Sequence, residues 1–341
     1  MYNKIKQGMF SVLVFMLVTL SLNFIIIVNK TYAAEETPEI EQCLQEKIMQ
    51  ADNSMTVAEL RLHCQKIVTG TDAGNGTTEV TSNLEHRAQS QKAAWKNPFV
   101  ISVHKPNYVL LFAKNKNTNE APFEKQLPNE DTSLDDSELK FQISVKFPLA
   151  LNLFERNDEI FFAYTNRSFW QLYKTISGPF RETNHEPEIF YSLKTKLNFF
   201  KMVNMGFVHQ SNGRAGTLSR SWNRLYALFV FEKNNWVLGF KPWYRISEKI
   251  EDDNNPDIED YMGNFEFTGV YTKGHHTFSA MVRNNLKSTD NRGAVQIDWV
   301  FPLTKYFSGY VQYFNGYGES MIDYNYDQES IGIGFALSGW L

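Results

Sequence analysis

A histidine, a serine and an asparagine lie close together in the segment from 207 to 223. His209 and Ser211 are two residues apart at the end of an apolar run, and Asn223 begins the next such run after a polar loop. A serine hydroxyl becomes a nucleophile when a base takes its proton, and a third group must fix the orientation of that base. The spacing therefore suggests acyl-ester chemistry, with Ser211 as nucleophile, His209 as base and Asn223 as orienting residue.

Two observations limit this interpretation, and a third excludes an alternative to it. A His-x-Ser pair is common, so the spacing alone also fits ordinary hydrogen-bonded residues at the rim of a strand pair. An asparagine accepts a hydrogen bond from an imidazole but cannot stabilise an imidazolium as a carboxylate does, although near hydrocarbon a neutral group costs less to bury. The chain contains no G-x-S-x-G motif, which excludes an α/β-hydrolase.

The three side chains are predicted to share one face of a strand pair. Side chains alternate between two faces along a strand. His209 and Ser211 end the more apolar row of the first run, which includes every second residue of 203–207, and Asn223 begins the apolar row of the next run. If an antiparallel hairpin pairs Ser211 with Ser221, His209 lies opposite Asn223, with Cβ atoms about 5 Å apart. This face is expected to contact lipid.

The region from Phe99 to the C-terminus predicts an all-β fold, a transmembrane antiparallel β-barrel of about twelve strands. Short and long connections alternate, as in outer-membrane barrels with short periplasmic turns and longer external loops, which would place the loop 212–221 outside the cell. An even strand number closes the sheet and removes its edges. The predicted strands lie near 99–113, 139–149, 159–168, 186–195, 199–211, 222–232, 235–246, 261–272, 275–285, 293–301, 306–315 and 329–341.

The N-terminus carries the features of an export signal. Lys4 and Lys6 precede an apolar stretch from Met9 to Val28, and the small residues Thr31 and Ala33 stand at the two positions that a signal peptidase reads. We predict a signal peptide over 1–33, with an uncleaved anchor as the alternative because the stretch is long. Its removal takes away three lysines and changes the formal net charge from -4 to about −7, which argues against nucleic acid as a partner.

The average composition resembles that of a water-soluble chain. Mean hydropathy is -0.38 although 15% of the residues are aromatic. Polar and apolar residues alternate along the strands of a membrane barrel, so an average over the chain does not reveal the apolar face. A high aromatic content is typical of the aromatic girdles at the two membrane interfaces. The composition is therefore compatible with a bacterial outer-membrane location.

Residues 34–98 read as a short N-terminal periplasmic segment. Residues 34–68 predict two short helices, each with one of the two cysteines of the chain, Cys43 and Cys64. In an exported protein such a pair favours a disulfide over free thiols, since its spacing fits no redox or metal motif. Residues 69–98 are a polar linker without a clear period, to which we assign no structure.

Six blocks of the chain resemble those of bacterial outer membrane phospholipase A. The likeness covers roughly residues 99–341, in order and with closely matching spacing. The blocks are SGPFRETNHEPE (177–188), HQSNGR (209–214), SRSWNRLY (219–226), KPWY (241–244), NPDIEDYMG (255–263) and GYGESMIDYNYDQ (316–328).

The resemblance implies a twelve-stranded barrel that is active as a calcium-bound homodimer and hydrolyses acyl esters of phospholipids and lysophospholipids in the outer membrane. It implies the roles given above for His209, Ser211 and Asn223. It further implies that Ca²⁺ is held by the backbone oxygens of Arg214 and Ser219 and by the hydroxyl of Ser177 from the partner subunit. The alternative function is a passive channel or structural barrel whose rim contains the same residues.

Some residues depart from the family pattern. Asn166, predicted to project toward lipid, stands where the family usually has a glutamine with a role in the dimer interface, and His185 stands where the family has tyrosine. We interpret His185 as an exposed loop residue rather than a second base. The acidic loop 252–260 lacks EF-hand spacing and is interpreted as a solvated external loop.

Overall fold

The computed structural model describes Cys43 and residues 83–95, 101–126, 133–154, 156–174, 178–304 and 307–338. The chain divides into two compact units, Met1–Val80 and Thr81–Leu341, and only the second is described beyond a single residue. The predicted signal peptide, the two predicted helices of 34–68 and Cys64 lie outside the described residues. Cys43 itself is disulfide-bonded.

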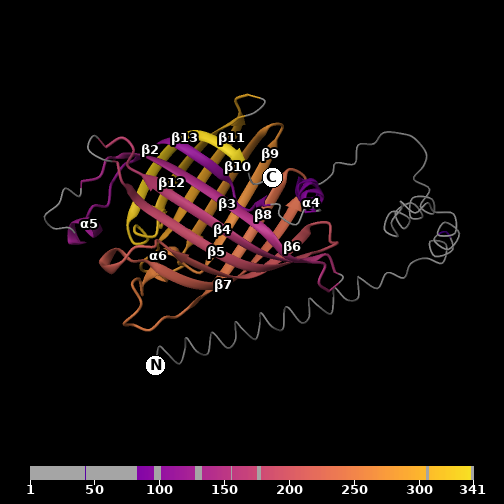
Figure 1. Cartoon of the computed structure of the whole chain (residues 1–341), viewed down its shortest axis with the longest axis horizontal. Helices are drawn as coiled ribbons and strands as arrows, with labels where there is room; N and C mark the ends of the chain where they lie inside the picture. Colours follow the sequence, from indigo (N-terminus) through magenta and orange to yellow (C-terminus); the bar gives the residue numbers. More distant parts are fainter. Residues whose placement is uncertain are drawn as a thin grey trace. The chain divides into compact units, whose positions relative to one another are not determined.

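Twelve strands, β2 to β13, pair with their sequence neighbours in antiparallel fashion. The pairing of β13 with β2 closes the sheet into a barrel, which confirms the predicted fold (Figure 1). The short strand β1 (Ser102–Val103) pairs with β3. The others are β2 (Asn107–Asn115), β3 (Ser137–Leu151), β4 (Asp158–Trp170), β5 (Phe180–Lys194), β6 (Phe200–Ser211), β7 (Ser221–Lys233), β8 (Trp236–Ile246), β9 (Phe265–Lys273), β10 (His276–Asn284), β11 (Gly293–Pro302), β12 (Ser308–Tyr317) and β13 (Asp327–Ser338).

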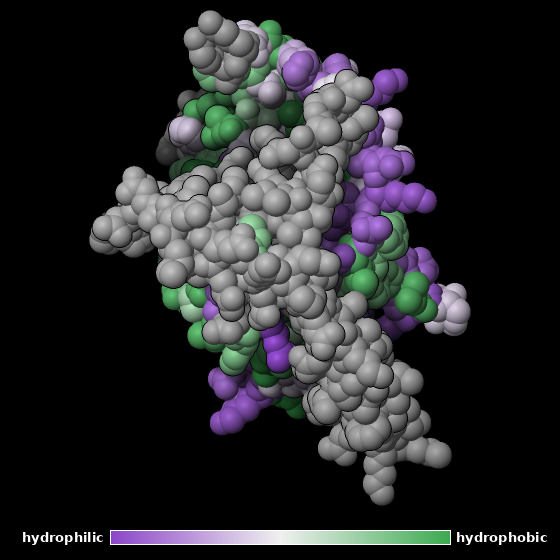
Figure 2. Space-filling model, turned by 90° about the vertical axis from the view of Figure 1, so that its right-hand side faces the viewer, coloured by the Kyte–Doolittle hydropathy of each residue, from purple (hydrophilic) through white to green (hydrophobic). Residues whose placement is uncertain are grey.

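The two faces of the barrel wall differ as the alternation predicts. On β7, Trp222 and Arg224 are buried at 0% and 6% exposure, whereas Leu225 on the opposite face is 51% exposed. Large apolar side chains are also exposed on the same face of neighbouring strands, for example Met205 and Phe207. Figure 2, which views the molecule from the right-hand side of Figure 1, shows patches of hydrophobic side chains among hydrophilic ones on the coloured part of the surface. The apolar face points outward, and the inward face is packed.

The two ends of the barrel have different connections. At the short-turn end the strands are joined by 152–157, 195–199, 234–235, 274–275 and 303–307. Asn234 and Gly274 there have φ values of 54° and 59°, as expected in two-residue hairpin turns. The long-loop end has the connections 116–136, 171–179, 212–220, 247–264, 285–292 and 318–326, which contain α5 (Ala121–Gln126) and α6 (Ile258–Met262).

Two predicted strand boundaries were wrong. Strand β5 begins at Phe180 rather than at residue 186. Its first residues carry polar side chains on both faces, so no alternation of polar and apolar residues marks them as part of a strand. Strand β9 begins at Phe265 rather than at 261, because Ile258 and Met262 are the buried side chains of helix α6. The predicted single strand 99–113 is also interrupted, between β1 and β2.

Helix α4 (Asn83–Ala94) lies in the linker to which the sequence assigned no structure. Leu84 packs against a buried cluster formed by Val230, Val237 and Val270 of β7, β8 and β9. On the opposite wall, the Arg87 guanidinium donates to the carbonyl oxygen of Val103, which belongs to β1, at 3.2 Å. The helix therefore lies across the lumen at the short-turn end (Figure 1). Among the described residues, no helix is long and apolar enough to cross a membrane.

The rest of the lumen is filled by side chains. Phe161, Phe190, Trp222 and Trp243 belong to one buried cluster. A cavity of about 120 Å³ lies beside it, and its lining includes both cations and carboxylates, Arg224 and Glu186 among them. The interior of the barrel is thus packed rather than an open pore, as expected for a barrel of this strand number.

Candidate active site

Strands β6 and β7 bring His209 and Asn223 together. Their register pairs His209 with Asn223 and Ser211 with Ser221, which is the predicted register. His209 Nδ1 lies 2.9 Å from Asn223 Oδ1, and Asn223 Nδ2 donates to Glu248 Oε1 at 3.0 Å. Because the amide nitrogen is engaged by a carboxylate, the amide oxygen faces His209, so Nδ1 carries the proton. Nε2 is left as the basic nitrogen of the imidazole.

All three predicted residues lie on the outward face. His209, Ser211 and Asn223 are half-buried and continue the rows that contain the exposed Phe207 and Leu225. The side chains that alternate with them are buried in the barrel interior. The imidazole, the hydroxyl and the amide therefore project away from the lumen, near the long-loop end of the barrel.

Ser211 is the last residue of β6 and has a neighbour on each side. It pairs with Ser221 of β7 and with His185 of β5. Since His209 and Ser211 are two residues apart on one strand face, they are adjacent positions of the outward surface. Any group that reacts with Ser211 approaches from outside the barrel.

His185 is a strand residue, which corrects its interpretation as an exposed loop residue. It lies within β5, is half-buried, and its Nδ1 is 2.6 Å from the Tyr164 hydroxyl oxygen. A Cβ added to Gly213 would lie 3.6 Å from its Nε2, so the ring packs against the turn after Ser211. The error followed from placing the start of β5 at residue 186.

Asn212 organises the loop that contains the predicted calcium ligands. This side chain is 4% exposed, and its Nδ2 donates to the Leu218 carbonyl oxygen at 2.8 Å. Its Oδ1 accepts from the backbone N–H groups of Arg214 and Arg220 at 3.3 and 3.0 Å. One buried amide therefore holds both ends of the loop together, a role that an asparagine in a polar loop does not reveal in the sequence.

The two backbone oxygens of this loop that are predicted to hold calcium differ in their present contacts. Among the described residues, no hydrogen bond reaches the Arg214 carbonyl oxygen, while the Ser219 carbonyl oxygen accepts from Arg220 Nη1 at 2.7 Å. The described part of the chain contains no group of three or more His, Cys, Asp or Glu that could hold a metal ion. A metal at this loop would thus depend on neutral oxygens and water, a donor set that Ca²⁺ accepts. Ser177 lies outside the described residues.

The carboxylates of the acidic loop 252–260 bind neighbouring side chains. Asp253 pairs with Arg245 at 2.8 Å, and Asp260 accepts from Lys287 at 2.7 Å. Asp257 accepts from the Tyr324 hydroxyl at 2.6 Å, and burial together with this bond raises the pKa of Tyr324. These carboxylates bind neighbouring side chains and do not converge on one point.

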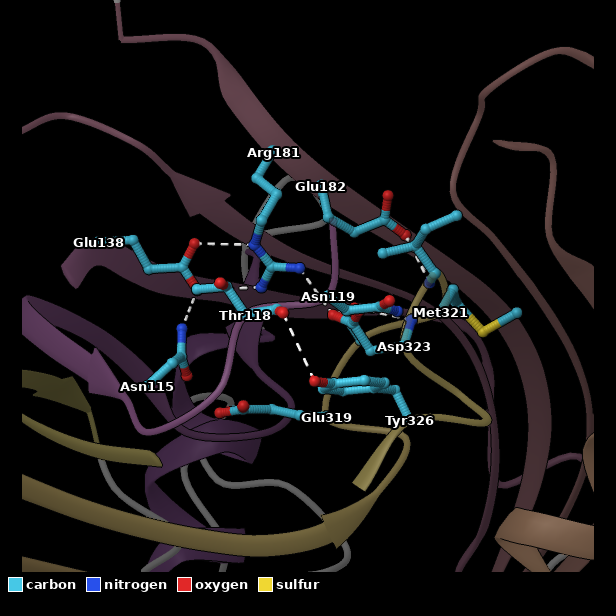
Figure 3. A network of polar contacts seen from close by, with 12 residues as sticks. Asn115, Thr118, Asn119, Glu138, Arg181, Glu182, Glu319, Met321, Asp323 and Tyr326 are labelled. Carbon is cyan, nitrogen blue, oxygen red and sulfur yellow. Dashed lines mark hydrogen bonds and ion pairs between the residues drawn. The ribbon is translucent and has the colours of Figure 1, made fainter. Parts of the chain in front are cut away.

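A buried polar network anchors the long loops at this end of the barrel (Figure 3). Arg181 donates to both oxygens of Glu138 at 2.9 Å and to Asp323 at 2.6 Å, and all three residues are at most 4% exposed. Asn119 donates to the same aspartate at 3.0 Å. The Arg214 guanidinium in turn donates to the Arg181 carbonyl oxygen at 2.6 Å. The network thereby connects the loop 318–326 to the loop after Ser211.

Replacing Arg181 by methionine should strongly destabilise the barrel. The substitution leaves the carboxylates of Glu138 and Asp323 buried without their cation, and breaking a buried pair in this way costs about 3–5 kcal/mol. Urea unfolding in detergent, followed by tryptophan fluorescence, measures the change. The matched variant is Lys116→Met, whose exposed pair with Glu329 at 2.8 Å should leave the unfolding midpoint unchanged. Equal midpoints for both variants would contradict the assignment.

Comparison with known proteins decides the family. The model of the phospholipase A1 family matches residues 84–337. The chain is also 37% identical to the phospholipase A1 of Klebsiella pneumoniae over 247 residues, which are 71% of this chain and 84% of that protein. The chain belongs to the phospholipase A1 family. It is an outer-membrane phospholipase. These comparisons do not support the alternative function, a passive channel or structural barrel.

Solved structures of relatives have the same fold. The outer membrane phospholipase dimer of Salmonella typhi with bound calcium superposes with a TM-score of 0.67 at 35% identity, over 73% of this chain and 96% of that chain. An asparagine-to-alanine active-site mutant of the outer membrane phospholipase A of Escherichia coli superposes with 0.66 at 35% identity, over 72% and 94% of the two chains. The β-barrel of this phospholipase is therefore the barrel of the family.

Proposed function

We propose that this phospholipase cleaves acyl esters of phospholipids and lysophospholipids on the outward face of its barrel, with Ser211 as nucleophile, His209 as base and Asn223 as orienting residue. The observation that carries the proposal is the 2.9 Å contact of His209 Nδ1 with Asn223 Oδ1, on the same face as Ser211. The E. coli relative supports the role of the amide, since replacement of an asparagine makes an active-site mutant of that protein.

The proposed reaction has two halves. The Nε2 atom of His209 takes the proton of the Ser211 hydroxyl as its oxygen attacks the ester carbonyl carbon. The tetrahedral intermediate collapses, the bond to the glycerol oxygen breaks, and that oxygen receives the proton from the imidazolium. Water, deprotonated by the same Nε2, then attacks the acyl-serine. The bond between the acyl carbon and the serine oxygen breaks, this oxygen receives the proton from the imidazolium, and the fatty acid is released. Asn223 keeps the ring in place during both halves.

The position of the nucleophile suits a substrate that remains in the membrane. Ser211 ends the row of outward-facing side chains of β6 that contains the exposed Met205 and Phe207. A phospholipid in the outer leaflet can therefore place its acyl chains along the barrel wall and its ester at the level of Ser211. The lipid does not need to enter the packed lumen.

Calcium is the proposed cofactor. The carbonyl oxygens of Arg214 and Ser219 would hold it, in a loop that Asn212 keeps in shape, with the Ser177 hydroxyl of a second copy as a further ligand. A bound Ca²⁺ with its waters would stabilise negative charge that develops on the ester carbonyl oxygen. The dimeric calcium-bound relative supports this proposal.

A homodimer is the proposed active assembly. Asn166 of β4 lies on the outward face, where its Oδ1 accepts from Ser168 at 3.0 Å and its Nδ2 lies 3.5 Å from His185 Nδ1. An amide on the lipid-facing side of the barrel costs free energy unless its polar atoms are hydrogen-bonded. A second copy of the chain could supply further hydrogen-bond partners to Asn166. Dimerisation would also bring Ser177 of that copy to the calcium loop.

Covalent labelling tests the nucleophile directly. A fluorophosphonate with an alkyl chain should react with the calcium-loaded phospholipase at Ser211, because an activated serine attacks the phosphorus and displaces fluoride. Peptide mass spectrometry locates the adduct, and His209→Ala should lower the labelling rate at least about 100-fold. Modification of another serine, or equal labelling of the His209→Ala variant, would refute the assignment.

A further inference from the structure

The Asn223 amide is bonded at both of its ends, and its second partner is a carboxylate. Its oxygen lies 2.9 Å from His209 Nδ1, and its nitrogen donates to Glu248 Oε1 at 3.0 Å. Glu248 is half-buried and belongs to the loop 247–264, which follows β8. A third element of the fold therefore contributes to the site, and imidazole, amide and carboxylate form a continuous hydrogen-bonded row.

We propose that Glu248 is a positioning residue of this phospholipase and acts on His209 through Asn223. The proposal rests on the catalytic roles proposed above. The two ends of an amide have nearly the same shape, so sterics alone do not determine which end faces the imidazole. An ionised carboxylate can only accept hydrogen bonds, so Glu248 holds the nitrogen end of the amide. The oxygen end is then fixed toward the Nδ1–H group of His209.

The carboxylate also supplies the negative charge that an amide lacks. A neutral asparagine stabilises an imidazolium less than a carboxylate does, because its oxygen carries only a partial charge. Hydrogen bonds in a row polarise one another, so a bond to an anion makes the amide oxygen a stronger acceptor. Glu248 thus favours the imidazolium that forms when Ser211 gives up its proton.

Placing the charge one group away from the imidazole has a physical advantage. A carboxylate in the row of Phe207 and Leu225 would border hydrocarbon, where an ion is costly. Glu248 lies instead in a half-exposed loop at the long-loop end, where water can solvate it. The neutral amide spans the distance from this polar position to His209.

The neighbouring charged side chains of the loop pair with groups other than Glu248. Lys249 and Glu251 are exposed and lie 4.0 Å from each other, and Arg245 pairs with Asp253 at 2.8 Å. Within the described part of the chain, no cation lies at ion-pair distance from Glu248. Its charge is therefore available to the amide.

A double-mutant cycle tests the coupling, with calcium saturating and folding checked by protease resistance. Glu248→Ala should lower kcat about 10-fold while KM changes less than about 2-fold, since it removes an interaction that strengthens in the transition state. In an Asn223→Ala background the same substitution should have no further effect, because the connecting amide is gone. Glu251→Ala, on the same loop, should match the unmodified enzyme. An equal loss in both backgrounds, or a change in KM alone, would overturn the proposal.

A second pair of variants gives a signature that loss of fold cannot mimic. Asn223→Asp places two carboxylates about 3 Å apart, and their repulsion should impair the site. Adding Glu248→Gln to Asn223→Asp should then raise kcat at least about 5-fold, because the glutamine amide can donate to the new aspartate. No gain from the second substitution would overturn the proposal.

The two proposals can fail separately. If Asn223→Ala leaves kcat unchanged, the catalytic roles proposed above are wrong and the role of Glu248 is wrong with them. If Asn223→Ala lowers kcat while Glu248→Ala does not, only the role of Glu248 is wrong.

Discussion

Replacement of Ser211 by alanine should abolish phospholipid hydrolysis, with kcat reduced at least about 1,000-fold. The substitution removes the only oxygen at this position that can form the acyl-serine, and loss of one member of such a triad typically leaves little of its rate enhancement. Release of fatty acid from phosphatidylcholine in mixed micelles with calcium measures the effect. The barrel should remain folded, since the Ser211 side chain is half-buried at the end of β6 and is not part of the interior.

Ser221→Ala is the matched control for this variant. Ser221 is the cross-strand partner of Ser211, has the same side chain and lies on the same strand pair. In the proposed mechanism only Ser211 forms the acyl-enzyme, so removal of the Ser221 hydroxyl should leave kcat within about 2-fold. Equal turnover by the Ser211→Ala protein and the unmodified enzyme would eliminate the proposed chemistry.

Chelation of calcium should have the second largest effect. With EGTA in excess, hydrolysis should fall at least about 100-fold, comparable to the loss of an oxyanion-stabilising group, and added Ca²⁺ should restore it. Mg²⁺ should restore little, because it requires a tight octahedral shell that a loop of backbone oxygens does not supply. Undiminished turnover in EGTA would show that the carbonyl oxygens of Arg214 and Ser219 do not serve a metal.

Chemical cross-linking in the same samples separates the two proposed roles of calcium. If the Ser177 hydroxyl of a second copy completes the site, the cross-linked dimer should decrease as calcium is removed and return with the activity. Persistence of the dimer in EGTA without activity would assign calcium to the chemistry alone.

Much of the barrel is predictable from the sequence, because lipid on one side and a filled lumen on the other impose alternation. The apolar row that ends in His209 and Ser211 fixes their face, and the pairing with Asn223 follows from the register of one hairpin. The alternation fails where both faces are polar. This is the reason that the start of β5, around Arg181 and Glu182, was missed.

The rest of the site depends on contacts between segments that are distant along the chain. Glu248 reaches Asn223 from an irregular loop, and no periodicity indicates such a contact. His185 was assigned to a loop because the strand boundary was misplaced, although it pairs with Ser211 itself. Asn212 looks like any loop asparagine until its three backbone bonds are seen. Spacing predicted the candidate reacting groups, whereas the residues that hold them in place could be found only in the tertiary structure.

The location of α4 constrains the order of assembly. The helix precedes every strand in the chain, yet Asn83 donates to Thr272 of β9 and Leu84 packs on β7, β8 and β9. Its binding surface therefore does not exist until the later strands have been synthesised and joined. Although α4 precedes every strand of the described chain, it is then among the last elements to reach its final place.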